Sequence, residues 1–155
     1  MKWPCRAEKR ATGNASIILT KADASLRHIE ASIAAFDEGH YDVAITLAGA
    51  AEGMAPETGT ALFPYLRDHP RIAAEGVGKT EWVSALNVER DWLKHHAPSH
   101  PATMEFERAS AAIMLVRAIS KAQAAFKFRS EATEEFRRWI NENVETLFSD
   151  DDAQP

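Results

Sequence analysis

Apolar residues recur at intervals of three and four along most of this chain, and this spacing constrains its fold more than any other feature. Between residues 21 and 38 the apolar positions are Ala22, Leu26, Ile29, Ile33 and Phe36. Such spacing places them on one face of an α-helix. The sequence shows no convincing alternation of polar and apolar residues, which half-buried β-strands would require. We therefore expect an all-α protein built as an up-and-down helical bundle.

Glycine, proline and capping residues divide the apolar pattern into about five helices. We expect these helices over about residues 21–38, 41–54, 80–97, 104–128 and 130–147. Gly39 and Pro56 end the first two. Thr80 is expected as the N-cap of the third helix, and Ser130 begins the fifth. The short break after Gly39 predicts that the first two helices are antiparallel neighbours.

Length and composition fit a single domain. The chain has 155 residues, enough for one continuous core. We divide it into a flexible basic segment at 1–19, one helical domain at 20–148 and an acidic tail at 149–155. The first residues lack the apolar stretch of a secretory signal, and no apolar run is long enough to span a membrane. A cytoplasmic protein without membrane partners is the simplest interpretation.

Charge and cysteine content exclude several classes of site. The formal net charge of -5 argues against a dedicated nucleic-acid-binding protein, because such proteins usually carry an excess of basic residues. It still allows local handling of RNA at one site. Cys5 is the only cysteine, so we expect neither an intrachain disulfide nor a thiolate-rich metal site.

Two familiar site patterns are present only in part. Residues 73–80, AAEGVGKT, satisfy a permissive phosphate-binding-loop pattern, but the preceding LRDHPRI makes a poor buried strand. We interpret this stretch as a loop before a helix. His96 and His100 have the spacing of helical zinc ligands, but Pro98 interrupts it and further ligands are not evident. We therefore expect no metal ion and no other cofactor.

The stretch ERDWLKHH, residues 89–96, gathers side chains suited to proton transfer and phosphate binding. Asp91 and His95 are four residues apart, so on a helix the carboxylate could orient the imidazole. Arg90 and His95 are five residues apart, which separates them by about 140° around a helix. They would converge only at a distorted helix end or across a two-fold axis between two copies of the chain. A simpler interpretation is that these cations complement the dipole at the end of a helix.

A resemblance to a known superfamily adds to this interpretation. It is carried by two stretches, LNVERDWLKHHA and YDVAITLAGAAEGM. The first is similar to an LN...RN..KHA stretch, and the second to a small-residue helix, in bacterial members of the HEPN superfamily (higher eukaryotes and prokaryotes nucleotide-binding). The superfamily motif is an arginine, commonly followed by a polar residue, and then a histidine after a short spacer. Arg90, Asp91 and His95 fit this motif, and the likeness covers roughly residues 20–128.

The resemblance implies a helical bundle that cleaves RNA without a metal at a dimer interface. His95 would exchange a proton with the 2′-OH or with the leaving oxygen, since imidazole titrates near neutral pH. Arg90 would bind the phosphate, and Asp91 would orient His95 or the local backbone. The secondary candidates are His96, Lys94 and Asn87.

Two carboxylates fall inside apolar patterns and are also secondary candidates. Glu52 lies among alanines, and Glu89 lies between Leu86 and Leu93. A buried carboxylate needs a partner, and Arg90 or a histidine is suitable. For both carboxylates, an ion pair or a position at the rim of the core is favoured over a role in the site.

Two functional hypotheses follow. The leading one is a nucleotide- or RNA-directed HEPN-like module, with a metal-independent endoribonuclease of toxin or defence type as its most specific form. Its expected partners are a second copy of the chain, RNA or a nucleotide, and a cognate antitoxin or other partner protein. The alternative is a non-catalytic dimerisation or partner-binding protein. A nuclease would expose Arg90 and His95 in one groove, whereas a structural role would pair them with Glu52 or Glu89.

Overall fold

The computed structural model describes residues 13–58 and 79–147, without the side chains of residues 79–86, 144 and 145. Within these ranges the chain forms five helices and no strand. The helices are α1 (Lys21–Asp37), α2 (Tyr41–Met54), α5 (Lys79–Lys94), α6 (Arg108–Phe126) and α7 (Glu131–Leu147). The all-α helical bundle is therefore confirmed. None of the described helices combines the length and the apolar character needed to cross a bilayer.

The connection between α1 and α2 depends on Gly39. This residue has a φ of 80°, which side-chain-bearing residues rarely adopt. Its N–H donates to the carbonyl of Phe36 at 3.0 Å, and the N–H of His40 donates to the carbonyl of Ala35 at 2.8 Å. These two bonds satisfy carbonyls that the end of α1 would otherwise leave unpaired. The chain then reverses into α2, and the predicted break at Gly39 is confirmed.

Small side chains let α1, α2 and α6 pack closely. On α2, Ala44, Ala48 and Ala51 are fully buried. Ser25 and Ser32 of α1 donate hydrogen bonds to carbonyl oxygens of α2, at 3.3 Å and 2.7 Å respectively. Helix α6 contributes a further buried alanine series together with Leu115. These three helices form the core that supports the candidate site.

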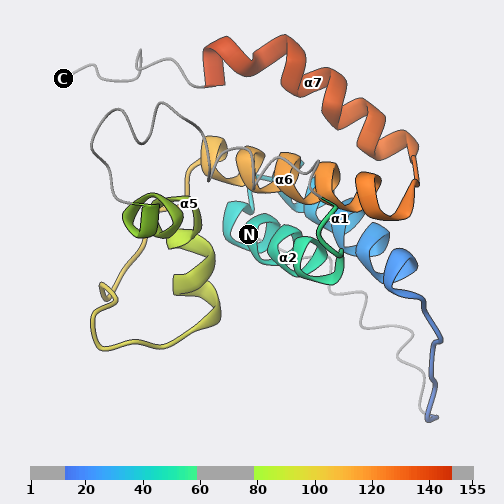
Figure 1. Ribbon diagram of the computed structural model, residues 1–155, viewed down its shortest axis with the longest axis horizontal. Coiled ribbons are helices and arrows are strands. Elements are labelled where there is room, and N and C mark those ends of the chain that lie inside the picture. Colours follow the sequence, from blue (N-terminus) through green and yellow to red (C-terminus); the bar gives the residue numbers. More distant parts are fainter. Residues whose placement is uncertain (1–12, 59–78, 148–155) are drawn as a thin grey trace.

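The two remaining helices lie on different sides of this core. In Figure 1, α5 lies at one end of the bundle, and α7 covers the side of α6 away from α2. The described part of α5 packs on α2, whereas α7 packs on α1 and α6. Phe136 and Trp139 of α7 contact the ring of Phe36, with ring centroids 5.4 and 5.2 Å apart. The start of α7 follows the prediction, because the backbone N–H of Thr133 donates to the hydroxyl of Ser130.

Several predicted boundaries differ from the structure, including the end of α5, which lies at Lys94 and not at residue 97. Helix α5 already includes Lys79, so Thr80 lies inside the helix and is not its N-cap. Helix α6 runs from Arg108 to Phe126, whereas the apolar pattern predicts residues 104–128. It ends early because Lys127 adopts a left-handed conformation, with a φ of 59°. The predictions for Cys5, for residues 59–78 and for the acidic tail lie outside the described residues.

Candidate functional site

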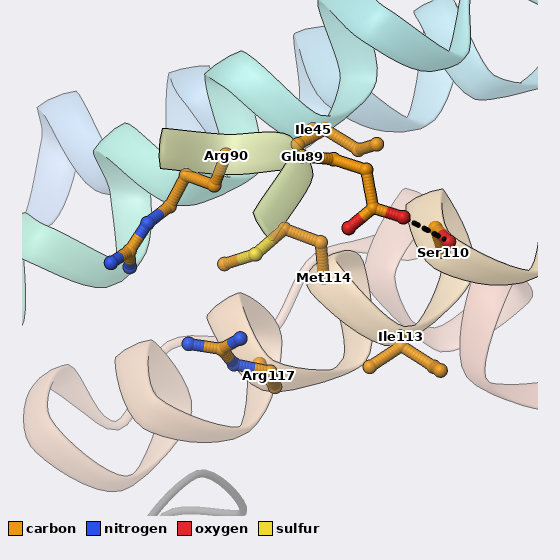
Figure 2. Close-up of a pocket in the computed structure, with 7 residues that line it drawn as sticks. All are labelled: Ile45, Glu89, Arg90, Ser110, Ile113, Met114 and Arg117. Atoms are coloured by element: carbon orange, nitrogen blue, oxygen red, sulfur yellow. Dashed lines mark hydrogen bonds between the residues drawn. The ribbon is translucent and has the colours of Figure 1, made fainter. Parts of the chain in front are cut away.

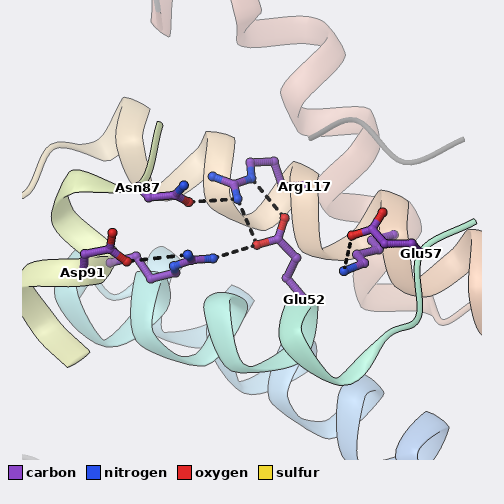
Figure 3. A network of polar contacts seen from close by, with 7 residues as sticks. Glu52, Glu57, Asn87, Asp91 and Arg117 are labelled. Carbon is purple, nitrogen blue, oxygen red and sulfur yellow. Dashed lines mark hydrogen bonds and ion pairs between the residues drawn. The ribbon is translucent and has the colours of Figure 1, made fainter. Parts of the chain in front are cut away.

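A buried carboxylate near the end of α2 anchors a network of polar side chains (Figure 3). Glu52 is only 4% exposed. Its Oε1 accepts a hydrogen bond from Arg117 Nε at 3.1 Å, and its Oε2 accepts from Arg117 Nη2 at 2.9 Å. Oε2 also accepts from Arg90 Nη1 at 3.2 Å. One carboxylate therefore joins guanidinium groups from α5 and α6, and the expected pairing of Glu52 with Arg90 is confirmed.

Arg117 is the buried partner in this network. Arg117 is only 1% exposed, and its Nη2 also donates to Asn87 Oδ1 at 3.1 Å. Burial lowers the pKa of Arg117 from its ordinary value, while the charge and hydrogen bonds of Glu52 act in the opposite direction. The planar fork of an arginine suits such a two-bond contact with a carboxylate. Removing one partner of a buried pair typically costs about 3–5 kcal/mol, because the other charge stays buried alone.

Arg90 reaches Glu52 by crossing the surface of α2 at Gly49. A Cβ atom at Gly49 would lie 2.9 Å from Arg90 Cδ and 3.1 Å from Cγ, so the absent side chain leaves the space that the arginine stem uses. The guanidinium also contacts Asp91 Oδ1 through Nη2 at 3.5 Å. The side chain of Arg90 remains 24% exposed. The network therefore fixes this arginine while leaving part of it open to solvent.

A small pocket lies beside this network, between α2, α5 and α6 (Figure 2). We call it the arginine pocket, with a volume of about 110 Å³. Its polar lining comes from Glu89, Arg90, Ser110 and Arg117. Glu89 accepts a hydrogen bond from the Ser110 hydroxyl at 2.8 Å. This half-buried carboxylate is therefore bound by a hydroxyl of α6, where the sequence predicts Arg90 or a histidine as its partner.

The histidines of the motif lie at a second pocket, at the end of α5. We call it the histidine pocket; its volume is about 520 Å³. Its polar and aromatic lining comes from Trp92, Lys94, His95, His96 and His100, and Pro101 lies beside them. Asp91 pairs with Arg90, whereas the resemblance implies that it orients His95 or the local backbone. In one chain Arg90 and His95 thus line different pockets.

The structure brings together only part of the predicted site. Glu52, Asn87, Arg90 and Asp91 lie in one network. Lys94, His95 and His96 lie together at the histidine pocket. Within the described residues, no group of three or more histidine, cysteine, aspartate or glutamate side chains is placed to hold a metal ion.

Sequence reasoning missed Arg117, the most deeply buried member of the network. A usable signal is present in the sequence. Arg117 is the only charged residue of α6 between Arg108 and Lys121, inside the apolar run AAIMLVRAI. A charge inside such a run needs a partner of opposite sign, and Glu52 presents the same problem in α2. An ion pair between Arg117 and Glu52, inferred from their two apolar surroundings, would have predicted the contact between α2 and α6.

Comparisons with known protein families, with curated protein sequences and with solved structures give no match to this chain.

Proposed function

We propose that this protein is an RNA-directed, HEPN-like module that cleaves RNA without a metal ion. The observation that supports it most is the fixation of Arg90. A buried carboxylate holds its guanidinium at the protein surface, and the exposed His95 follows at the end of the same helix. An arginine fixed in this way can bind a phosphate without first losing side-chain freedom.

The geometry of α5 favours a site built from two chains. The N–H of His95 donates to the carbonyl of Asp91 at 3.0 Å, so the helical hydrogen-bond pattern reaches His95, the first residue after α5. Arg90 and His95 therefore stay on different faces, separated by about 140°. A distorted helix end would have brought them together within one chain. Pairing of two α5 ends across a two-fold axis would place Arg90 of one chain beside His95 of the other.

The two side chains divide the chemistry of RNA cleavage. Arg90 would bind the scissile phosphate and stabilise the charge that builds on its oxygens. His95 would take the proton from the 2′-OH or supply one to the leaving 5′ oxygen. The 2′ oxygen forms a bond to phosphorus as the bond to the 5′ oxygen breaks, so no other reactant is needed. Membership of a toxin or defence system, with a cognate antitoxin as partner, is part of this proposal.

One observation favours the alternative, a non-catalytic dimerisation or partner-binding protein. Arg90 has two acidic partners, Glu52 and Asp91, as a structural arginine would have. In that case the network would hold α5 against α2 and α6. The arginine would then contribute to stability and not to any reaction.

The test is RNA cleavage by the purified protein in EDTA, beside Arg90→Ala and His95→Ala. We expect each variant to lose about 100-fold or more of the activity, as removal of an acid–base group or a charge-stabilising donor does. Arg138→Ala and His28→Ala remove the same side-chain types from α7 and α1 and should retain it. Circular dichroism and sizing confirm that the variants are folded. A wild-type protein that does not cut RNA, or cleavage that both site variants retain, would favour the alternative.

A further inference from the structure

The histidine pocket has the size of a ligand site, and the part of its lining that the structure describes is not acidic. Its volume of about 520 Å³ lies within the roughly 300–1,000 Å³ of small-ligand pockets. None of the described residues that line it is an aspartate or a glutamate. The neighbouring carboxylate of Asp91 is paired with Arg90. An anion would therefore meet no like charge among the described residues of the pocket wall.

Trp92 gives this pocket a fixed aromatic surface. The indole Nε1 donates to the carbonyl of Pro101 at 2.9 Å, which holds the loop after α5 close to the helix. The ring also meets Phe106 edge-on, with centroids 5.9 Å apart. Trp92 is only half-buried, so part of its side chain stays accessible. The pocket thus presents an aromatic side chain that is already ordered before any ligand binds.

Cationic and titratable side chains surround this indole. Lys94, His95 and His96 are exposed, and His100 is half-buried. All four line the same pocket, in a chain whose formal net charge is -5. Local positive charge at a lysine attracts phosphate groups even where the whole protein is acidic. The imidazoles of His95, His96 and His100 can donate hydrogen bonds to phosphate oxygens.

We propose that the histidine pocket binds one unpaired nucleotide of an RNA strand. The base would stack on Trp92, and Lys94 and His100 would contact the adjoining phosphate. Aromatic side chains combined with cations are the usual means of binding single strands, because every base offers a face for stacking. The choice of RNA rests on the proposed function, whereas the preference for an unpaired strand rests on the pocket itself.

The first test measures binding without cleavage. The probe is a fluorescein-labelled single-stranded RNA with 2′-O-methyl riboses, which cannot be cut by attack of the 2′ oxygen, and binding is followed by fluorescence anisotropy in EDTA. Lys94→Ala should weaken binding about fivefold, the upper range for an exposed charge pair. It should also reduce the slope of log K against log salt by about 0.7, as expected for one lost phosphate contact to a single strand. Arg138→Ala removes one exposed positive charge from α7 and should change neither value. Equal affinities and equal salt slopes for Lys94→Ala and Arg138→Ala would overturn the proposal.

The second test asks whether Trp92 stacks on a base. Binding of the probe should quench the tryptophan fluorescence of the wild-type protein. Trp92→Phe keeps an aromatic ring but removes this indole, one of four in the chain, so most of the quenching should disappear. The same strand annealed to its complement should bind at least about tenfold more weakly, since its bases are no longer free to stack. Quenching of unchanged extent in Trp92→Phe, or equal affinity for the duplex, would overturn the proposal.

The outcomes separate this inference from the proposed function. If the protein binds the uncleavable strand as expected but does not cleave ordinary RNA, the proposed nuclease activity is contradicted and the proposed binding pocket is supported. If the wild-type protein cleaves RNA but Lys94→Ala does not weaken binding, the proposed binding pocket is contradicted and the nuclease activity is supported.

Discussion

At the scale of single residues, Gly49 decides where Arg90 can lie. A Cβ at this position would come within 2.9 Å of Arg90 Cδ, which belongs to the middle of the side chain and not to its flexible end. Gly49→Ala should therefore displace Arg90 from Glu52. The two bonds from Arg117 to Glu52 would remain. We expect Gly49→Ala to fold and to lose RNA cleavage to the level of Arg90→Ala.

Gly53 provides the matched control, one turn further along α2. No atom of residues 13–58 or 79–147 is recorded within 4 Å of a Cβ built there, and Gly53 is exposed. Gly53→Ala should raise the free energy of unfolding by about 1 kcal/mol through helix propensity alone, with unchanged cleavage. A readout independent of activity is modification of Arg90 by phenylglyoxal, mapped by mass spectrometry. It should be faster in Gly49→Ala than in Gly53→Ala, and equal rates would show that Gly49 does not position the arginine.

The residue scale also shows which parts of the site the sequence could predict. The need of Glu52 for a cationic partner follows from one charge within an alanine-rich helix, and Arg90 is one of those partners. The second partner, Arg117, is 65 residues away in the chain. The separation of Arg90 from His95 follows from their five-residue spacing on α5. The shape of the pocket that His95 lines depends instead on the hydrogen bond between Trp92 and Pro101 in the loop after α5. A tertiary contact of this kind leaves no periodic pattern in the sequence.

At the scale of elements, the start of α1 is held by a reciprocal cap. Asp23 N–H donates to Thr20 Oγ1 at 3.0 Å, while the N–H and hydroxyl of Thr20 donate to Asp23 Oδ2 at 3.1 and 2.6 Å. The hydrogen bond from the Thr20 hydroxyl, followed by the one from its backbone, lowers the pKa of Asp23 from its ordinary value of 3.8. A carboxyl whose pKa is lower in the folded state stabilises that state above the unfolded pKa. This contribution is lost as the pH falls through the folded pKa.

Asp23→Ala should therefore lower the thermal midpoint at pH 7, and the difference from wild type should shrink below about pH 4. Thermal unfolding followed by circular dichroism at several pH values measures this difference. Glu30→Ala removes an exposed carboxylate from the middle of the same helix and corrects for the general effect of charge. A difference that does not change between pH 7 and acid would mean that the cap does not depend on the charge of Asp23.

The elements were predicted best where their ends carry a local signal. Gly39 ends α1 through its positive φ, and Ser130 caps α7 through its hydroxyl, so both boundaries are evident in the sequence. Helix α6 has no such signal. Its N-cap, Glu107, makes no side-chain capping bond, and its end is set by Lys127 in a conformation that glycine or asparagine would favour. The apolar pattern continues past both ends, which explains why the predicted helix is too long.

At the scale of the whole molecule, the separation of Arg90 and His95 leads to a test with mixed variants. In a dimer whose two sites each take Arg90 from one chain and His95 from the other, a pairing of Arg90→Ala with His95→Ala contains one complete site and one empty site. Equal amounts of the two inactive variants, unfolded and refolded together, should give half mixed dimers, so activity should return to about a quarter of wild type.

The mixing experiment also identifies the alternatives. Each variant refolded alone should stay inactive, which excludes recovery by refolding itself. If Arg90 and His95 act within one chain, no mixture contains a complete pair and activity stays absent. Such a result would require the loop after α5 to move His95 to the side of Arg90, because the helical hydrogen bond from His95 to Asp91 keeps them on different faces. Recovery near a quarter would instead mean that the described structure already holds each half of the site in place, with dimerisation as the step that completes it.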